Sequence, residues 1–434
     1  MTPGRSRALT GRVEWSLRLL VWVALVQAAC ATYHLEAADW PQWHGPRRDN
    51  ISTETGLLKQ WPSDGPQLQW TATGCGEGYS SVSIAGGLLF TAGVIDNQTY
   101  VLAFDLDGRP KWKSLNGEKG AVLPPRREWG RPWSGAKSTP TVDDGLVYHL
   151  NEVGRLAGFD AQGGNQVWAV DVMTRFKAVE PVAGYAESVL VVSDKVICYP
   201  GGTDGSLVAL DKKTGKVVWA NTEIGDQPSY SSPILVEDNG VRQIVAMSAR
   251  AVFGVEADTG RLLWRSEHVN RDEENVDTPI YHEGCVFVSS GYGRGADMLR
   301  PTFGGTAIGV DKAWSNERFG NLHGGTVLLD GRIYGVSYDA RSWCCLEVRT
   351  GQLQYRGRGL GETSLTYADG MLYCLGDRGT MALVPPSPDG FEPVSRFELP
   401  SGGRGPYWAH PVVCGGRLYV RHADRVFAYD VRAK

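Results

Sequence analysis

The stretch "ALDKKTGKVVW" (Ala209–Trp219) follows the pattern A-x-D-x-x-T-G-x-x-x-W, and the same register returns along the chain. Versions of it end at Trp168 ("GFDAQGGNQVW"), at Trp264 ("GVEADTGRLLW") and at Tyr355 ("CLEVRTGQLQY"). Shorter or weaker versions end at Trp70, Trp112, Trp314 and Phe397. The intervals between these eight aromatic residues run from 41 to 56 residues. That period is typical of propeller blades and not of short helical repeats.

The repeated turn has a physical explanation that requires no cofactor. Asp211 can accept hydrogen bonds from the backbone N–H groups of the turn. Gly215 can take the positive φ of a tight strand connection. Trp219 then lies at a fixed distance beyond the turn, where its ring can pack against the neighbouring blade. We therefore predict structural turn and wedge roles for Asp211, Thr214, Gly215, Trp219, Trp112, Trp168 and Trp264.

A second motif alternates with the first. Runs such as "KSTPTVDDGLVYHL" and "TSLTYADGMLYCLG" place a Gly-containing turn between two apolar segments, a pattern typical of an antiparallel hairpin. A hairpin, a third strand that ends in x-x-D and a fourth strand that ends in Trp make one blade. The sequence therefore predicts an all-β fold, an eight-bladed β-propeller of four-stranded antiparallel blades.

The two ends of the repeat region predict how the ring closes. The C-terminal run Pro411–Lys434 has room for only three strands, whereas Trp70 in "PQLQW" precedes any hairpin of its own. We expect this N-terminal strand to complete the C-terminal blade, because closure removes exposed sheet edges. We predict an N-terminal extension at 32–65 that packs on the propeller, followed by a single propeller domain at 66–434.

Residues 1–31 have the features of a signal peptide. Arg5, Arg7 and Arg12 precede the apolar run "LLVWVALVQAA" (Leu19–Ala29), which is too short to span a bilayer as a helix. Cleavage near Ala31 would make this an exported protein of the periplasm or cell envelope, with no transmembrane segment beyond the signal. An uncleaved membrane anchor and attachment through Cys30 are the alternatives.

Composition and cysteine spacing exclude several classes of site. Of the 434 residues 21% are charged, and the net charge of −4 gives no basic field for nucleic acid. No C-x-x-C, zinc pair or haem motif occurs among the cysteines. The adjacent Cys344 and Cys345 fall on an expected third strand, where successive side chains point to opposite faces. We therefore expect no disulfide between them and predict no metal site.

The repeats, together with "DWPQWHGPRRDNISTETGLLKQWP" (Asp39–Pro62), resemble the PQQ-like (quinoprotein-type) propeller family. The family's turn pattern is met in full at Ala209–Trp219, and the likeness extends over nearly all of the chain after the predicted signal peptide. The branch it resembles is an exported bacterial one, similar to the outer-membrane assembly lipoprotein propellers. The resemblance implies an eight-bladed propeller, but such folds serve both quinone-dependent dehydrogenases and non-enzymatic assembly proteins.

A dehydrogenase of this family would need a quinone pocket. Such a pocket has a stacking Trp floor, a calcium ion held by carboxylate and amide oxygens, an Asp base and a disulfide between adjacent cysteines. Linear motifs in this chain assemble no calcium-ligand set. We therefore expect no cofactor, with PQQ and calcium as the alternative.

The candidate binding residues lie in the connections between blades, which gather on one face beside the central funnel. One connection carries "PRREWGRPWSG", and the starts of the first strands add further polar and aromatic side chains. "NRDEEN" (Asn270–Asn275) on that face is interpreted as a solvated acidic loop. The predicted set is Arg126, Arg127, Trp129, Arg131, Trp133, Tyr79, Tyr185, Glu187, Tyr230, Asp277, His323, Trp408 and His410.

These observations favour a monomeric, non-enzymatic scaffold that binds an envelope protein, an extended peptide or a small ligand at the mouth. A PQQ-dependent alcohol or sugar oxidoreductase is the alternative. A carbohydrate-binding propeller that uses Trp129–Trp133 is a weaker one.

Overall fold

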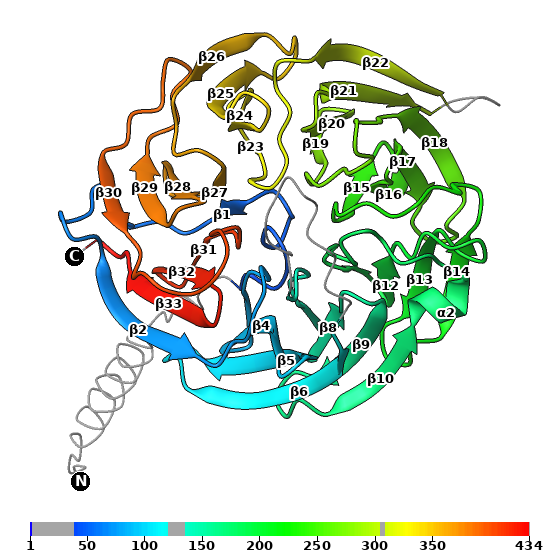
Figure 1. Cartoon of the computed structure of the whole chain (residues 1–434), viewed down its shortest axis with the longest axis horizontal. Helices are drawn as coiled ribbons and strands as arrows, with labels where there is room; N and C mark the ends of the chain where they lie inside the picture. Colours follow the sequence, from blue (N-terminus) through cyan, green and yellow to red (C-terminus); the bar gives the residue numbers. More distant parts are fainter. Residues whose placement is uncertain (2–38, 120–134, 304–308, 434) are drawn as a thin grey trace. The chain divides into compact units, whose positions relative to one another are not determined.

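The computed structural model describes residues 39–119, 135–303 and 309–433, together with Met1. Eight antiparallel sheets follow one another in a ring (Figure 1), which confirms the predicted all-β, eight-bladed propeller. Among these residues no helix is long and apolar enough to cross a membrane. The predicted signal peptide lies outside the described residues, so it stays a prediction, as do the three domain boundaries.

The blades are numbered in chain order, and each contributes four strands from the axis outwards. Blades 1 to 4 comprise β3 (Ser83–Ala85), β4 (Leu88–Ile95), β5 (Gln98–Asp105) and β6 (Pro110–Glu118); β7 (Thr141–Asp143), β8 (Leu146–Leu150), β9 (Arg155–Asp160) and β10 (Gln166–Asp171); β11 (Leu190–Val192), β12 (Lys195–Cys198), β13 (Leu207–Asp211) and β14 (Val217–Asn221); and β15 (Ile234–Asp238), β16 (Val241–Met247), β17 (Ala251–Glu256) and β18 (Leu262–Glu267). The short helix α2 (Val172–Phe176) follows β10.

The second half of the ring has the same plan. Blades 5 to 8 comprise β19 (Ile280–His282), β20 (Cys285–Ser290), β21 (Gly295–Thr302) and β22 (Gly309–Asn316); β23 (Val327–Leu329), β24 (Arg332–Ser337), β25 (Ser342–Glu347) and β26 (Leu353–Gly357); β27 (Thr363–Ala368), β28 (Met371–Gly376), β29 (Thr380–Val384) and β30 (Ser395–Glu398); and β31 (Val412–Cys414), β32 (Arg417–His422), β33 (Arg425–Asp430) and β2 (Gln67–Thr73).

The ring is closed by β2, which is the outermost strand of blade 8. It pairs antiparallel with β33, from Gln67 opposite Asp430 to Thr73 opposite Arg425. This confirms the predicted closure, in which the N-terminal strand completes the C-terminal blade. Closure ties the two ends of the propeller into one sheet, so that every blade has its four paired strands.

An additional strand, β1 (Ile51–Ser52), lies on the axis side of blade 7. It pairs in parallel with β27, Ile51 opposite Tyr367 and Ser52 opposite Ala368. Figure 1 shows β1 on the inner side of β27, close to the centre of the ring. A segment of the chain that precedes the first blade therefore enters the central channel.

The apolar core is divided into clusters that lie between neighbouring blades. One joins blades 3 and 4 through residues such as Ile197 and Phe253, which are fully buried. The others follow the same plan around the ring. Two clusters also include residues from before the first blade, Trp40 between blades 8 and 1 and Trp61 between blades 7 and 8. Each blade is thus stabilised chiefly by contact with its neighbours.

Tryptophans of the outer strands join one blade to the next by a repeated contact. Each indole N–H donates to the backbone carbonyl of the residue that follows the turn acid in the next blade. The pairs are Trp70 to Leu106 (2.9 Å), Trp112 to Ala161 (3.0 Å), Trp168 to Lys212 (2.9 Å), Trp219 to Ala257 (3.3 Å) and Trp314 to Val348 (2.9 Å).

The same contact explains the glycine of the turn. Gly260 has a φ of +74°, and a Cβ placed on it would lie 2.3 Å from Cε3 of Trp219. Gly215 has a φ of +69°, and a Cβ there would lie 2.7 Å from Cε3 of Trp168. A side chain at either position would meet both backbone strain and the ring of the preceding blade.

The turn acid stabilises the backbone on which the indole rests. Oδ1 of Asp211 accepts hydrogen bonds from the backbone N–H of Thr214 (2.8 Å) and from its hydroxyl (2.7 Å). Glu347 accepts the equivalent pair of bonds from Thr350 at 2.7 and 2.6 Å. The D-x-x-T-G pattern therefore builds a platform that receives the tryptophan of the preceding blade.

Trp264 departs from this pattern. Its indole N–H donates to Oε1 of Gln243 at 2.7 Å, within its own blade. The connection between β21 and β22 in the next blade has no T-G turn, and it includes residues 304–308, which lie outside the described part. Trp264 is nevertheless buried, at 3% exposure, in the cluster between blades 4 and 5.

We predict that Trp219→Ala lowers the free energy of unfolding by about 3–5 kcal/mol, because it removes a buried ring and its hydrogen bond to the next blade. Val218→Ala on the same strand is the matched control, since Val218 is 46% exposed, and it should change the free energy by less than about 0.5 kcal/mol. Chemical denaturation followed by fluorescence and circular dichroism measures both. Equal effects of the two substitutions would contradict the wedge role.

Candidate functional site

Eight equivalent positions form a ring at the mouth of the channel. Except in blade 7, each lies four residues before the first strand of its blade. In blade 7 the position lies immediately before β27, because that strand begins earlier in the repeat than the first strands of the other blades. We call this set the mouth ring: Tyr79, Lys137, Ala186, Tyr230, Val276, His323, Glu362 and Trp408. All eight are half-buried, whereas the next two residues in every blade are buried. The mouth ring therefore marks, in each blade, the last partly exposed position before the buried residues that lead into the first strand.

Three aromatic members of the mouth ring are connected through Trp408. His323 and Trp408 stack with ring centroids 4.1 Å apart and an angle of 12° between their planes. Tyr79 also contacts Trp408, with ring centroids 5.3 Å apart and an angle of 43° between the ring planes. These residues come from three connections widely separated in sequence, so the closed ring alone brings them together.

The mouth ring contains one acidic residue, Glu362, and one lysine, Lys137. Nδ1 of His323 lies 3.4 Å from Oε2 of Glu362. Burial opposes ionisation of Glu362, but His323 and the charge of Arg341 outweigh it and hold the pKa of this carboxyl below its ordinary value. Lys137 makes no hydrogen bond or ion pair with any residue in the described part of the chain. Burial lowers its pKa, against the opposing charge of Glu152.

Below the mouth ring, hydroxyl groups connect the inner strands of consecutive blades. The backbone N–H of Ser81 donates to Oγ1 of Thr139 at 3.0 Å, and that of Thr139 to Oγ of Ser188 at 2.9 Å. The backbone N–H of Ser188 continues the series to Oγ of Ser232 at 2.9 Å. The hydroxyl of Ser81 extends it in the other direction, onto the carbonyl of His410 at 2.6 Å. These hydrogen bonds, which we call the hydroxyl circuit, thus join the openings of the first strands of blades 8, 1, 2, 3 and 4.

The channel beneath is occupied by the segment Trp40–Ser52, which we call the pin. Its first residue pairs with blade 1, since Trp40 and Ile84 exchange two backbone hydrogen bonds of 2.8 Å. Val142 of blade 2 donates to the carbonyl of Pro41 at 2.7 Å. Its last two residues form β1 against blade 7. Both ends of the pin therefore lie beside the ends of inner strands that are farthest from the mouth, and the middle of the pin approaches the mouth.

The middle of the pin contacts the remaining blades. The indole N–H of Trp43 donates to Oγ1 of Thr278 in blade 5 at 3.0 Å. His44 contacts His410 of blade 8, and a Cβ on Gly325 of blade 6 would lie 3.3 Å from its Cε1. Arg48 donates to backbone carbonyls of blades 3 and 4. The pin therefore touches all eight blades.

Arg48 is the most deeply embedded charge of the pin, at 3% exposure. Its guanidinium donates to the carbonyls of Ser188 (2.9 Å) and Pro233 (2.8 Å), to the carbonyl of Val189, and to Oε1 of Gln42 (2.9 Å). Burial lowers the pKa of Arg48 to about 9, and the nearby Glu187 opposes the shift. These hydrogen bonds to oxygen compensate the loss of water around the buried charge.

Three non-glycine residues of the pin have left-handed backbone conformations. The φ values are +61° at His44, +56° at Arg48 and +60° at Asn50. Such conformations cost on the order of 1 kcal/mol or more at each non-glycine residue, and they persist only where surrounding contacts determine them. The contacts with all eight blades therefore hold the pin in a shape that an isolated peptide would not keep.

The hydrogen bonds assign the tautomers of the central histidine pair. Nε2 of His410 lies 2.8 Å from the carbonyl of His323, so it carries the proton and donates. Nδ1 of His410 must then accept, and the group 3.1 Å away is Nε2 of His44, which donates. Burial lowers the pKa of His410 to about 4, which keeps the ring neutral. Trp43 stacks on His44, with ring centroids 4.2 Å apart, and its ring is tilted by 51° to that of His410, whose centroid lies 4.4 Å away.

Several residues of the predicted site lie below the mouth rather than at it. Tyr185 is in the core between blades 2 and 3, where its hydroxyl donates to the carbonyl of Pro200 at 2.9 Å. Glu187 is 2% exposed and accepts from the backbone N–H of Tyr199 at 2.8 Å. Asp277 is 3% exposed and accepts from Ser289 at 2.7 Å. Burial raises the pKa of each of these two carboxyls to about 7.

The remaining predicted residues divide into two groups. Tyr79, Tyr230, His323 and Trp408 belong to the mouth ring, and His410 lies beneath it. Arg126, Arg127, Trp129, Arg131 and Trp133 lie outside the described residues, so their placement at the mouth stays a prediction.

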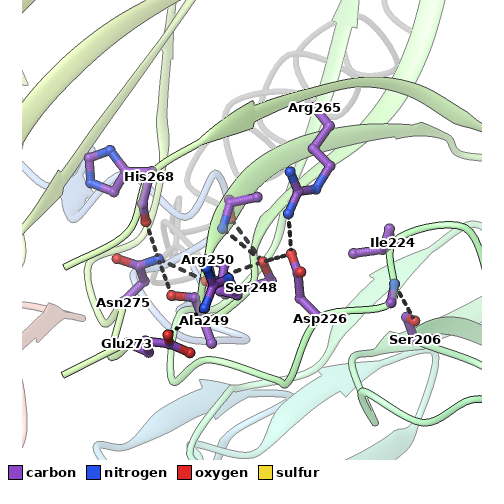
Figure 2. Close-up of polar contacts among 12 residues, drawn as sticks. Ser206, Ile224, Asp226, Ser248, Ala249, Arg250, Arg265, His268, Glu273 and Asn275 are labelled. Atoms are coloured by element: carbon purple, nitrogen blue, oxygen red, sulfur yellow. Dashed lines mark hydrogen bonds and ion pairs between the residues drawn. The ribbon is translucent and has the colours of Figure 1, made fainter. Parts of the chain in front are cut away.

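The acidic loop Asn270–Asn275 differs from its interpretation as a solvated segment only at its two ends. Asn270 is 4% exposed and Asn275 is fully buried. Nδ2 of Asn275 donates to the carbonyls of Ser248 (2.8 Å) and His268 (3.0 Å). Figure 2 shows this contact beside the ion pair of Arg250 with Glu273 and that of Arg265 with Asp226. The asparagines therefore anchor the loop, whereas its charged residues Arg271–Glu274 are exposed or half-buried, as the interpretation of a solvated acidic loop requires.

A Ser–His–Asp arrangement joins the end of β18 in blade 4 to strands β20 and β21 of blade 5 but has no access to solvent. Nδ1 of His268 lies 3.0 Å from Oδ2 of Asp297, and its Nε2 lies 3.2 Å from Oγ of Ser290. All three side chains are fully buried, and the Ser290 hydroxyl is hydrogen-bonded to Asn275. A nucleophile must reach its substrate, so this group is a structural network that connects loop and strands.

The quinone site that the family resemblance implies does not fit the residues present. The pin fills the channel on the axis. Cys344 and Cys345 are both free, and they lie in different clusters on opposite faces of blade 6. Among the described residues, no three His, Cys, Asp or Glu side chains are placed to hold a metal ion. The residues around the axis therefore form a packed hub and not a quinone pocket.

The residues that the sequence did not single out as site residues are those of the pin, together with Ala186, Val276, Lys137 and Glu362 of the mouth ring. Each of the last two has a recognisable place, because it precedes the small polar residues that open a first strand, as Tyr79 does before Ser80. Alignment of the eight hairpin openings would have found both. The pin is not part of the repeat, so an alignment of the blades would not find it. The only indication in the sequence is the high frequency of Trp, His and Arg just before the first blade.

Comparison with known proteins gives two kinds of relative. The family profile described as "Outer membrane protein assembly factor BamB" matches residues 97–357. Quinohemoprotein alcohol dehydrogenase ADH IIB of Pseudomonas putida is 27% identical over 220 residues, which cover 47% of this chain and 27% of that protein. Outer membrane protein assembly factor BamB of Nitrosomonas eutropha is 28% identical over 192 residues, 42% of this chain and 41% of that one.

Among solved structures, BamB of Moraxella catarrhalis superposes with a TM-score of 0.58 at 15% identity. The match covers 85% of this chain and 98% of that one. A likeness at this identity concerns the fold. The matched segments span less than half of the length of either curated relative, so the activities in their names do not transfer with the alignment.

We predict that His410→Gln reduces the loss of stability in acid. The pKa of His410 lies at about 4 in the folded protein, below the ordinary 6.5. The unfolded chain therefore takes up a proton between these values that the folded protein does not, and stability is lost as the pH falls from 6.5 towards 4. Between pH 7.5 and 5 this group accounts for about 2 kcal/mol of that loss.

Chemical denaturation at the two pH values measures the difference. His282→Gln is the control, because that half-buried ring on β19 lies beside Glu283, with 3.8 Å between Nε2 and Oε2, and not in the pin contacts. It should retain the wild-type dependence, and an equal change in both variants would contradict the assignment of His410.

Proposed function

Since this chain belongs to the PQQ-like propeller family whose profile is described as outer membrane protein assembly factor BamB, we propose that it is a binding scaffold of the cell envelope without catalytic activity. It acts after export, as a monomer that holds an envelope protein or an extended peptide at the mouth ring. The observation that carries this proposal is the composition of that ring, a set of half-buried aromatic and charged side chains above a channel closed by the chain's own pin.

The chemistry of the mouth ring suits recognition. Stacked aromatic rings offer apolar area at low conformational cost, and such residues dominate binding energy at protein interfaces. Glu362 and Lys137 supply one charge of each sign, which can orient a partner whose backbone or side chains carry complementary groups. The hydroxyl circuit ties the strand openings beneath Trp408, Tyr79 and Lys137 to one another, and a rigid site loses little entropy on binding.

A second candidate function is a quinone-dependent oxidoreductase. It is favoured by the sequence match to quinohemoprotein alcohol dehydrogenase ADH IIB. The filled channel and the separated cysteines weigh against it. Carbohydrate binding through Trp129–Trp133 is a weaker alternative, and it depends on residues outside the described part. A dye-linked alcohol assay with added PQQ and calcium distinguishes the enzyme from the scaffold, because a scaffold gives no turnover.

The test is photo-crosslinking in cells that express the exported protein. A photoreactive amino acid at Val276 of the mouth ring should give a discrete crosslinked product with an envelope protein, whereas the same probe at Val218 on an outer strand should not. Adding Trp408→Ala and Lys137→Ala should reduce that product at least about tenfold, which corresponds to about 1.4 kcal/mol.

Thermal melting shows that the substituted protein is still folded. A product that forms equally at Val276 and Val218, or one that persists unchanged in the double variant, would refute binding at the mouth.

A further inference from the structure

The guanidinium of Arg48 lies in a cage made of oxygen atoms. Three backbone carbonyls, from Ser188, Val189 and Pro233, and the amide oxygen of Gln42 accept its hydrogen bonds. The buried carboxyl of Glu187 adds an electrostatic interaction with the same charge. Carbonyl, amide and carboxylate oxygens are also the ligands that calcium takes in proteins. A cage of this kind would suit a hard cation if no arginine filled it.

The aromatic part of the pin occupies the adjacent part of the axis. Trp43 stacks on His44 and also contacts its hydrogen-bonded partner His410, with ring centroids 4.2 and 4.4 Å away. His44 and His410 are 4% and 3% exposed. A planar cofactor bound on the axis would need the space that these rings fill. The pin thus places flat rings and a positive charge side by side at the hub of the propeller.

We infer that the pin is a built-in substitute for a quinone and its cation, with Arg48 in the place of the metal ion and the rings of Trp43 and His44 in the place of the planar cofactor. The hub is therefore complete without either group. Whatever binds at the mouth ring, this protein needs no calcium to hold its inner strands together and leaves no room for PQQ beneath the mouth.

The first experiment uses the wild-type chain. Calorimetry with PQQ and calcium chloride should give no saturable heat, and the melting temperature should be unchanged by millimolar calcium or by EDTA. Stoichiometric binding of PQQ, or a loss of stability in EDTA that calcium reverses, would overturn the inference. Neither result would affect crosslinking at the mouth, so this inference and the proposed function fail separately.

The second experiment empties the cage. Arg48→Ala should lower the melting temperature by about 5 °C or more, because it leaves Glu187 and the carbonyls without their partner. Methylguanidinium chloride or calcium chloride at constant ionic strength should recover part of that loss. Arg47→Ala is the matched control, since the Arg47 side chain is 56% exposed and pairs with Asp49 at 2.8 Å. It should melt like the wild type and respond to neither cation.

A third variant separates charge from packing. Adding Glu187→Gln to Arg48→Ala removes the buried carboxylate that was left behind, so the double variant should melt above the single one. If Arg48→Ala does not fold without added cations, refolding yield with and without methylguanidinium gives the same comparison. The inference is wrong if Arg48→Ala is as stable as Arg47→Ala, or if neither cation nor Glu187→Gln recovers any of its loss.

Discussion

The structure depends on one repeated contact, the insertion of an indole ring from the outer strand of one blade against the turn of the next. A sheet of four strands cannot bury both of its faces alone, and the clusters between blades show that each face is covered by a neighbour. The indole N–H fixes the direction of this packing, because its acceptor in these repeats is the carbonyl after the turn acid. This contact recurs with one geometry at five of the interfaces, so at these five each blade meets the next in the same way.

The second constraint is at the axis. Inner strands that converge around a channel leave it to be filled by water, a ligand or protein. Here the chain uses its own N-terminal segment, which passes from blade 1 through the centre and returns along blade 7. Arg48 and His44 adopt left-handed backbone conformations to make these contacts. The strain is compensated by hydrogen bonds to blades that are far apart in sequence, so the pin and the closed ring stabilise each other.

These two constraints together decide which residues are available for function. The residues that follow the mouth ring by one position in the sequence, such as Glu187 and Asp277, are buried and hydrogen-bonded to neighbouring strands. Those of the mouth ring itself reach solvent. The same fold in other proteins carries different activities. In this chain the pin fills the channel, and a site above a closed floor favours the binding of a surface feature of a partner over the enclosure of a cofactor.

The sequence by itself determined the number of blades and the turn platform, because both follow from spacing within about fifty residues. It also determined the closure by the strand around Trp70, because the strands left over at the two ends of the repeat region add up to one blade. Strand alternation also placed Cys344 and Cys345 on opposite faces. Only the tertiary structure decided the roles of Arg48, His44 and Tyr185. Arg48 bonds to carbonyls 140 and 185 residues away, and His44 to a ring 366 residues away. Such contacts exist only after closure brings eight inner strands to one axis, and no local periodicity encodes which of them a preceding segment will meet.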